Sequence, residues 1–394
     1  MPDEIYLDHA ASAPLSEQAR EALVGASLEF GDPLSIHGRG QAARRLIDDA
    51  RATIAEHLGA QADEIVFTSG GTESVALAIW GAVRSIRELG TRVVVSSVEH
   101  PSVGGITHTL ESDGFETIIV PADEWGRVDL DAWAAEVRKP GTLLASLQHA
   151  NHEIGTMQPL AQAARLAHEA GVLFHSDACQ TVGRLPIDAA ALGADLLSLS
   201  GHKFGGPAGV GALYIRRGVA VSAYPCGDDR ERKRRSGMEN LPGVAAMAVA
   251  LQEAVEAIPD RAGLGWRLTE RLRKGLASRV PGARVHGHPT QRVPHIVCFS
   301  IPGADTETLV MALDDRGFRI GAGSICSGAP GDPSPVLESI GVPATPGVRV
   351  SVGPETDDRA VDRFLIELAG LVAELGRVEE TSSRVMGRFA PGEG

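Results

Sequence analysis

Short apolar runs alternate with amphipathic stretches through roughly the first 250 residues. The runs that read as buried strands are Glu64–Thr68, Arg92–Ser96, Thr117–Val120, Leu143–Leu147, Val172–His175, Leu196–Leu199 and Val210–Ile215. Apolar residues at helical spacing predict helices over Gly38–Leu58, Ser74–Leu89 and Leu160–Ala170. Such alternation is typical of an α/β fold, a mostly parallel sheet covered by helices on both faces.

The pattern changes beyond Leu241, where the predicted helices are longer and the predicted strands are fewer. The predicted elements are helices Val244–Ala257, Trp266–Ala277, Thr306–Arg316 and Asp357–Leu375, and strands Ile296–Ser300 and Val348–Val352. A chain of 394 residues exceeds the size at which one core stops growing. We therefore expect a large domain over residues 15–255, a smaller α+β domain from residues 1–14 and 256–376, and a flexible tail over 377–394.

The net charge and the spacing of the cysteines indicate which partners and which kinds of site the protein should lack. A formal net charge of −14 argues against a nucleic-acid partner. We find no signal-like leader and no apolar window long enough to span a membrane, so we expect a cytoplasmic protein without membrane contact. Cys179, Cys226, Cys298 and Cys326 lie far apart. We therefore expect neither a thiolate metal site nor a disulfide framework, and a reactive thiol stays open.

One strand leads directly into a glycine-rich turn that carries a lysine. Leu196–Leu199 is followed by Ser200, Gly201, His202 and Lys203, and then by Gly205 and Gly206. A lysine desolvated in a pocket becomes a nucleophile that can hold a carbonyl as a Schiff base. A surface lysine in a hairpin is the alternative.

Other strand ends carry complementary groups. Gly70, Gly71 and Thr72 follow one strand and open a helix, which suits an anion such as phosphate, although an ordinary helix cap is the alternative. His100 follows a second strand and could stack on a flat ring or be purely structural. Asp177 ends a third strand, where a carboxylate can pair with a protonated pyridine nitrogen or cap a helix. Phosphate, aldehyde and ring nitrogen together indicate pyridoxal 5′-phosphate.

These motifs resemble those of the cysteine desulfurases, fold-type-I pyridoxal-phosphate enzymes of the class V aminotransferase group, from about Ile5 to Gly353. The matching segments are IYLDHAASAP, FTSGGTES, EHPSV, NHEIGTMQP, HSDACQ and SGHKFGGPAGVGALYIRR. The resemblance implies a seven-stranded, mostly parallel sheet in the large domain.

The resemblance also implies a role for each motif residue. Gly71, Thr72, Ser200 and His202 would bind phosphate, His100 would stack on the ring, Asp177 would hold its nitrogen, Gln180 would touch its phenolic oxygen, and Lys203 would hold its aldehyde. GAGSIC resembles the segment with the sulfur-accepting cysteine, which gives that role to Cys326 in the small domain. GVRVSVG resembles the substrate-carboxylate motif, so Arg349 would grip the amino acid. The alternative for Cys326 is a loop cysteine without a role. The alternative for Arg349 is a plain salt bridge at the end of a strand.

The chain departs from the family pattern at three places. His152 stands where the family has an asparagine that contacts the ring. Asp228 and Asp229 replace glycines, and Met238 replaces a threonine, in a segment whose counterpart reaches the partner subunit's phosphate. Two carboxylates beside an anion site are unfavourable unless neighbouring arginines offset them, and the basic cluster itself is alternatively a solvated loop.

The function implied is conversion of L-cysteine to L-alanine, with sulfur held on Cys326 as a persulfide for an acceptor protein. The resemblance also implies a homodimer with composite active sites. Its pathway, iron–sulfur cluster assembly among others, stays open. Two alternatives remain: another C–S or C–Se β-lyase, such as a selenocysteine or cystine lyase that does not need Cys326, and a non-catalytic scaffold that binds a partner.

Overall fold

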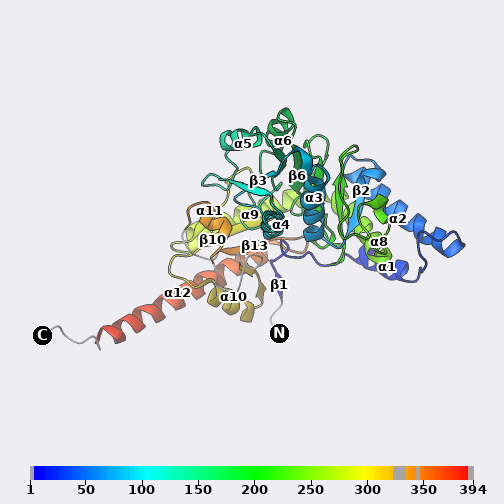
Figure 1. Cartoon of the computed structure of the whole chain (residues 1–394). Coiled ribbons are helices and arrows are strands. Elements are labelled where there is room, and N and C mark those ends of the chain that lie inside the picture. The colour runs from blue at the N-terminus through cyan, green and yellow to red at the C-terminus, as the bar shows by residue number, and fades with distance from the viewer. Residues whose placement is uncertain (1–3, 323–332, 343–346, 389–394) are drawn as a thin grey trace.

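A seven-stranded sheet forms the centre of the computed structural model, which describes residues 4–322, 333–342 and 347–388 (Figure 1). Its strands are β2 (Ile65–Thr68), β3 (Arg92–Ser96), β4 (Glu116–Val120), β5 (Thr142–Ser146), β6 (Leu173–Asp177), β7 (Leu196–Ser200) and β8 (Gly211–Ile215). They lie in the order β2-β8-β7-β6-β5-β3-β4, and only β8 runs antiparallel to its neighbours. The expected mostly parallel sheet is confirmed.

Helices cover both faces because alternate residues of the strands point to opposite sides. The helices are α1 (Glu17–Ser27), α2 (Gly38–His57), α3 (Gly71–Ser85), α4 (Pro101–Ser112), α5 (Leu130–Val137), α6 (Leu160–Glu169) and α8 (Leu241–Glu256). Phe67 packs with α1, α2 and α8, whereas its neighbour Val66 packs with α3 on the other face. Val94 contributes to the cluster under α5 and α6. Of these helices, α1, α4 and α5 were not predicted from the sequence.

A smaller unit holds an antiparallel sheet of order β12-β13-β10-β9. Its elements are α9 (Ile258–Arg279), β9 (Arg284–His286), β10 (Ile296–Ser300), α10 (Thr306–Asp315), β12 (Gly321–Ala322), α11 (Pro335–Ser339), β13 (Val348–Ser351) and α12 (Asp358–Arg388). The chain start joins this unit, because β1 (Ile5–Tyr6) pairs in parallel with β11 (Phe318–Arg319). Beyond it, the N-terminal segment Asp8–Pro14 leads toward the large sheet.

Two helices extend further than the sequence predicts. α9 begins at Ile258 rather than at Trp266. α12 continues to Arg388, so helical backbone occupies residues 377–388 of the expected tail and projects from the body (Figure 1). The stretch after Leu375 holds good helix formers and no proline before Pro391, which allows the helix to continue. The proposed domain boundaries stay a prediction.

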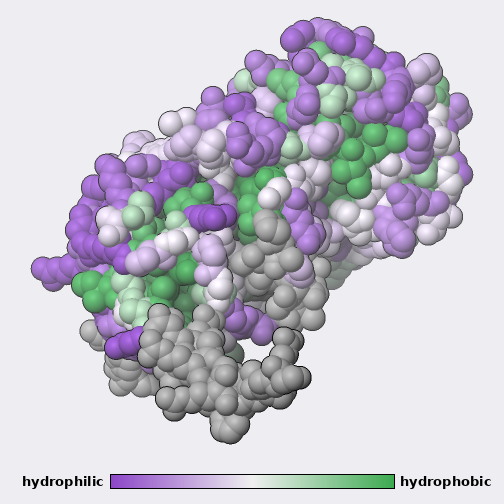
Figure 2. Space-filling model, turned by 90° about the vertical axis from the view of Figure 1, so that its left-hand side faces the viewer, coloured by the Kyte–Doolittle hydropathy of each residue, from purple (hydrophilic) through white to green (hydrophobic). Residues whose placement is uncertain are grey.

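On the face drawn in Figure 2, hydrophilic residues predominate and hydrophobic ones form separate patches. Within the described ranges, no single helix is long and apolar enough to cross a bilayer, and α8 with α9 reaches that composition only as a pair bent by 69°.

Candidate active site

A cavity of about 270 Å³ lies at the edge of the large sheet where β2, β3, β6 and β7 end. We call it the strand-end cavity. Its walls include ten of the eleven site residues predicted from the sequence: Gly71, Thr72, His100, His152, Asp177, Gln180, Ser200, His202, Lys203 and Arg349. The eleventh, Cys326, lies outside the described residues. Strand ends in an open sheet of this kind form the usual ligand crevice.

Lys203 reaches the cavity from the turn that follows β7. Its Nζ donates to the carbonyl oxygens of Ala10 (2.7 Å) and Ala11 (2.9 Å). The backbone N–H of Ala13 donates to the carbonyl of His202 (2.8 Å). The N-terminal segment is therefore part of the lysine's environment, a contact that no sequence spacing predicted.

The start of α3 provides an anion-binding end of the cavity. Gly70 adopts φ of +155°, a conformation that L side chains rarely adopt, and no side chain of the described residues caps the helix. A Cβ on Gly71 would lie only 2.7 Å from Cys179 Sγ, so a glycine is required there. Uncapped N–H groups of a first helical turn favour a phosphate. Ser200 Oγ and His202 Nδ1, 3.0 Å apart, add polar groups to the same cavity.

Asp177 supplies a buried carboxyl where β6 ends. Its side chain accepts from the N–H of Cys179 (2.9 Å), and the residue is 8% exposed. Burial raises the pKa of neighbouring Glu99 well above its usual value, and the charge of Asp177 adds to that rise. Glu99 therefore stays protonated and adds no negative charge beside Asp177. Gln180 lies close by, with its amide donating to the Ala10 carbonyl (2.9 Å).

Two histidine rings meet edge to face in the cavity. The ring centroids of His100 and His152 are 4.8 Å apart at 74°. Burial lowers the pKa of both, and that of His152 falls well below its usual value. His100 caps α4 through Nδ1, which accepts from the N–H of Ser102 (3.1 Å). Neither ring nitrogen of His152 has a hydrogen-bond partner among the described residues. Two neutral rings here suit contact with a flat aromatic ligand.

Arg349 enters the cavity from β13 of the smaller unit and is 2% exposed. Its Nη2 donates to Asp8 Oδ1 (2.9 Å), and its Nη1 donates to the carbonyl of His152 (3.0 Å). Its Nε is buried and has no hydrogen-bond partner in the described parts of the chain. The salt bridge considered from the sequence is present, yet it leaves a guanidinium N–H for a ligand.

In the segment that departs from the family pattern, the negative charges of the added carboxylates are offset by basic residues of the same segment. Arg230 is buried and pairs with Asp228 (3.0 Å), Asp32 (2.6 Å) and Glu239 (2.8 Å). Lys233 pairs with Asp229 (3.2 Å). The added carboxylates are thus offset, and the basic cluster is not merely a solvated loop. Met238 is 55% exposed.

The same segment is tied to the large domain by two further ion pairs. Arg51 pairs with Glu231 (2.7 Å), and both side chains are buried. Arg235 pairs with Glu73 (2.9 Å) in the first turn of α3. The segment is therefore fixed against the end of the strand-end cavity where α3 begins.

Two of the described cysteines are poor candidates for a reactive thiolate. Burial raises the pKa of Cys298, and it raises that of Cys179 well above the usual value, with the charge of Asp177 adding to the latter. Both thiols therefore stay protonated near neutral pH.

Sequence reasoning missed two residues that position others. Asp8 orients Arg349, and Arg184 Nη2 donates to the carbonyls of His9 (2.7 Å) and Lys203 (2.8 Å). Asp8 lies inside the quoted motif IYLDHAASAP, which offered a signal. Nothing in the spacing around Arg184 pointed to it.

Comparison with known proteins gives consistent matches along the chain. The model of the family described as aminotransferase class-V matches residues 5–364. The cysteine desulfurase IscS of Dictyoglomus turgidum is 38% identical over 379 residues, covering 95% of this chain and 96% of the relative. A cysteine desulfurase of Cereibacter sphaeroides is 39% identical over 382 residues, covering 95% and 97%. A solved NifS-like protein superposes with a TM-score of 0.87 at 30% identity, covering 94% and 99%.

Proposed function

The chain belongs to the aminotransferase class V family as a pyridoxal-phosphate-dependent cysteine desulfurase, and we propose that the strand-end cavity is its active site. The observation that carries this proposal is that ten motif residues, distant in sequence, line one cavity. When bound, pyridoxal phosphate supplies an aldehyde and an electron-poor ring that stabilises negative charge on the substrate's α-carbon.

The residues present fit this cofactor. The uncapped start of α3 offers N–H groups, and both ring nitrogens of buried His152 lack partners among the described residues. Unpaired buried polar atoms are costly and are usually satisfied by a ligand or water. Gly71, Thr72, Ser200 and His202 would hold the phosphate, His100 and His152 would contact the ring, Asp177 would pair with its nitrogen, and Gln180 would approach its phenolic oxygen.

Lys203 has two tasks in this proposal. Its Nζ would hold the aldehyde of the cofactor, and as a free amine it would take the proton from the substrate's α-carbon. The two carbonyls that it now contacts, of Ala10 and Ala11, would keep the freed amine close to the reacting carbon. Arg349 would bind the substrate carboxylate with its guanidinium, already oriented by Asp8.

Cys326, outside the described residues, is proposed as the sulfur acceptor. Its thiolate attacks the sulfur of the substrate, forming an S–S bond, while the Cβ–S bond breaks and its electron pair goes to carbon. That carbon takes a proton, so alanine leaves and Cys326 carries a persulfide. The sulfur then passes to an acceptor protein, for which iron–sulfur cluster assembly is one use to be tested.

We also propose a cytoplasmic homodimer. Leu28, Phe30, Leu34 and Ile36 expose large apolar side chains between α1 and α2, which a second copy would cover. Sedimentation of the purified protein should give a dimer, and Met238→Thr should slow cofactor loss on dialysis by adding a hydroxyl. A monomer that retains its cofactor would contradict the composite site, and cell fractionation would test the location.

The activity is tested by measuring alanine together with persulfide after L-cysteine is added. We expect the extra sulfur on the peptide that carries Cys326, and alanine formation that falls in Cys326→Ala. Cys226→Ala is the matched control, because Cys226 is exposed and does not line the strand-end cavity. Wild-type alanine release by Cys326→Ala would favour the β-lyase alternative, and no alanine from any variant would favour the scaffold.

A further inference from the structure

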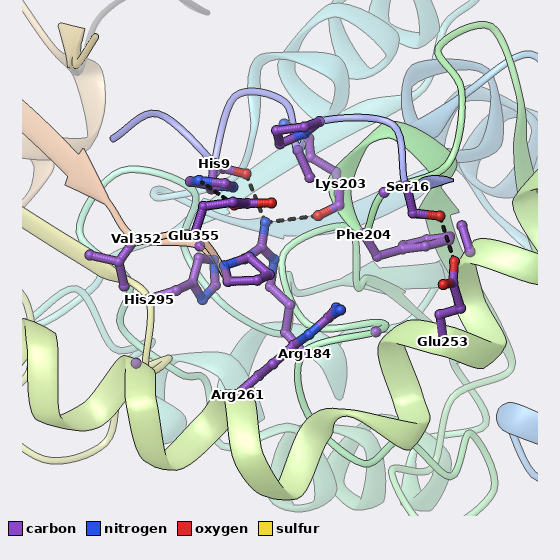
Figure 3. A pocket seen from close by; sticks show the side chains of 18 of the residues that line it. His9, Ser16, Arg184, Lys203, Phe204, Glu253, Arg261, His295, Val352 and Glu355 are labelled. Atoms are coloured by element: carbon purple, nitrogen blue, oxygen red, sulfur yellow. Dashed lines mark hydrogen bonds and ion pairs between the residues drawn. The ribbon is translucent and has the colours of Figure 1, made fainter. Parts of the chain in front are cut away.

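A second cavity, of about 310 Å³, adjoins the lysine turn and is lined by Lys203, Phe204 and Gly205 among others (Figure 3). We call it the rear cavity. Its walls come from the N-terminal segment, from α8 and α9, and from the residues that follow β13. Among the residues that the structure describes, Lys203 is the one that lines both this cavity and the strand-end cavity. The rear cavity is therefore a separate space, which none of the proposed cofactor or substrate roles uses.

Two guanidinium groups that line the rear cavity have N–H donors without a hydrogen-bond partner among the described residues. Arg184 uses Nη2 to bind the carbonyls of His9 and Lys203, but its buried Nε has no partner among the described residues. Arg261, from the first turn of α9, points into the cavity, and no hydrogen bond or ion pair reaches its guanidinium within the described ranges (Figure 3). Burial, with the charge of Arg261 adding, lowers the pKa of Arg184 to about 10. An anion between the two groups would relieve this repulsion.

The carboxylates around the rear cavity are engaged elsewhere or lie at its rim. Glu253 accepts from Ser16 Oγ (2.5 Å), and Glu17 pairs with Arg20 on its own helix. The side chain of Glu355 is 69% exposed and lies 3.7 Å from His9 Nε2. Burial lowers the pKa of His9 to about 4, so that ring is neutral. Ser16 is neutral, so Glu253 keeps its negative charge. Inside the cavity, the two guanidinium groups of Arg184 and Arg261 therefore face one uncompensated carboxylate, and the balance is positive.

The remaining wall is largely apolar. Phe204, Ile258 and Val352 line the rear cavity and are each less than a tenth exposed. The start of α9 also lies there, and no side chain caps it, which adds a positive helix end. A strongly hydrated inorganic ion would gain little from the apolar side of such a space. A short hydrocarbon chain that ends in one carboxylate matches both parts of the cavity, its carboxylate the guanidinium groups and its hydrocarbon the apolar wall.

We propose that the rear cavity binds a small aliphatic monocarboxylate, with its carboxylate between Arg184 and Arg261 and its hydrocarbon against Phe204 and Val352. Guanidinium groups bind carboxylates through paired N–H donors, so this contact gives the site its specificity. Arg184 also holds the Lys203 carbonyl, and Phe204 directly follows Lys203, so a ligand bound here contacts the lysine turn. The site is distinct from the one where cysteine reacts and does not depend on the desulfurase assignment.

Calorimetric titration of the holoenzyme with butyrate tests the proposal, because butyrate has no amine to react with the cofactor. We expect saturable binding to the wild type, binding weakened at least about tenfold in Arg261→Met, and unchanged binding in Arg349→Met. Butyramide, the neutral analogue, should not bind. Arg261→Met should unfold at the wild-type temperature, because this guanidinium has no partner to lose in the described structure.

A chemical readout locates the ligand independently. Phenylglyoxal modifies accessible arginines, and butyrate should slow its reaction at Arg261 but not at exposed Arg45 on α2. Equal rates at Arg261 with and without butyrate would overturn the proposal. So would the absence of saturable binding, or a loss of binding in Arg349→Met with none in Arg261→Met, which would place butyrate in the strand-end cavity instead.

Discussion

The two cavities that Lys203 lines are built in different ways. The strand-end cavity collects groups from the ends of four strands of one sheet, and these groups differ in chemistry: helix N–H donors, neutral imidazoles, a carboxyl and an amine. The rear cavity collects its walls from stretches spread between His9 and Glu355, and it sets the guanidinium groups of Arg184 and Arg261 against a largely apolar wall. Diverse groups on a rigid frame suit a cofactor with several functional groups, whereas two guanidiniums and an apolar wall suit one simple anion.

The largest effect should come from Lys203→Ala, because it removes the amine proposed to hold the cofactor and to move the proton. Alanine formation from cysteine should fall by roughly 10³-fold or more. Lys274→Ala is the matched control, since Lys274 is exposed on α9 and lines neither cavity. If Lys203→Ala kept a rate within a few-fold of the wild type, the lysine would not be part of the active site.

Next in size should be Asp177→Ala, which removes the proposed partner of the pyridine nitrogen. Turnover should drop by about 3 kcal/mol in transition-state stabilisation, roughly a hundredfold. Asp177→Asn keeps a side-chain acceptor for the N–H of Cys179 but carries no charge, so it should lose nearly as much. Full activity in Asp177→Asn would show that charge at this position is not needed.

A smaller effect with a distinct signature is expected for Arg349→Lys. The lysine keeps a positive charge toward Asp8 but loses the planar fork that binds a carboxylate with two donors. KM for cysteine should rise about tenfold or more while kcat changes little. A kcat loss at unchanged KM would instead indicate that Arg349 acts in the chemical step.

The last effect concerns the free energy of unfolding, through a contact between the loop that follows β5 and the N-cap residue of α11. Ser334 Oγ donates to Glu153 Oε2 (2.5 Å), and burial raises the pKa of Glu153 to about 7 from a usual value of 4.5. Folding thus binds a proton, so this group's stabilisation is complete below pH 4.5 and is lost as the pH rises through 7.

Denaturant unfolding at several pH values, on the wild type and on Glu153→Gln, measures this contribution. The permanently neutral variant should lack that decline, which is on the order of 1–3 kcal/mol. Parallel pH profiles for the two proteins would show that Glu153 does not titrate in this window.

The sequence predicted the large sheet and the strand-end cavity well because both follow from local patterns. Alternating apolar runs marked the strands, and residues immediately after each run, such as Asp177 and His100, had to meet at one edge. The prediction missed α1, α4 and α5, began α9 at Trp266 rather than at Ile258, and ended α12 at Leu375 rather than at Arg388.

The rear cavity had no such signal in the sequence. Arg184 and Arg261 are 77 residues apart, and they approach only because α9 docks on the turn beyond β6 and on the N-terminal segment. Likewise, the contact between Asp8 and Arg349 spans 341 residues. Such pairs depend on tertiary packing rather than on any local period, so neither propensity nor spacing could reveal them.

The most direct test is to reduce the pyridoxal-phosphate-loaded protein with borohydride, which fixes the cofactor to the lysine that holds it, and then to map the labelled peptide. The chain has only four lysines, Lys139, Lys203, Lys233 and Lys274, so the assignment is unambiguous. The cofactor should be found on Lys203 alone. A label on Lys139, Lys233 or Lys274, none of which lines the strand-end cavity, would contradict the proposed active site.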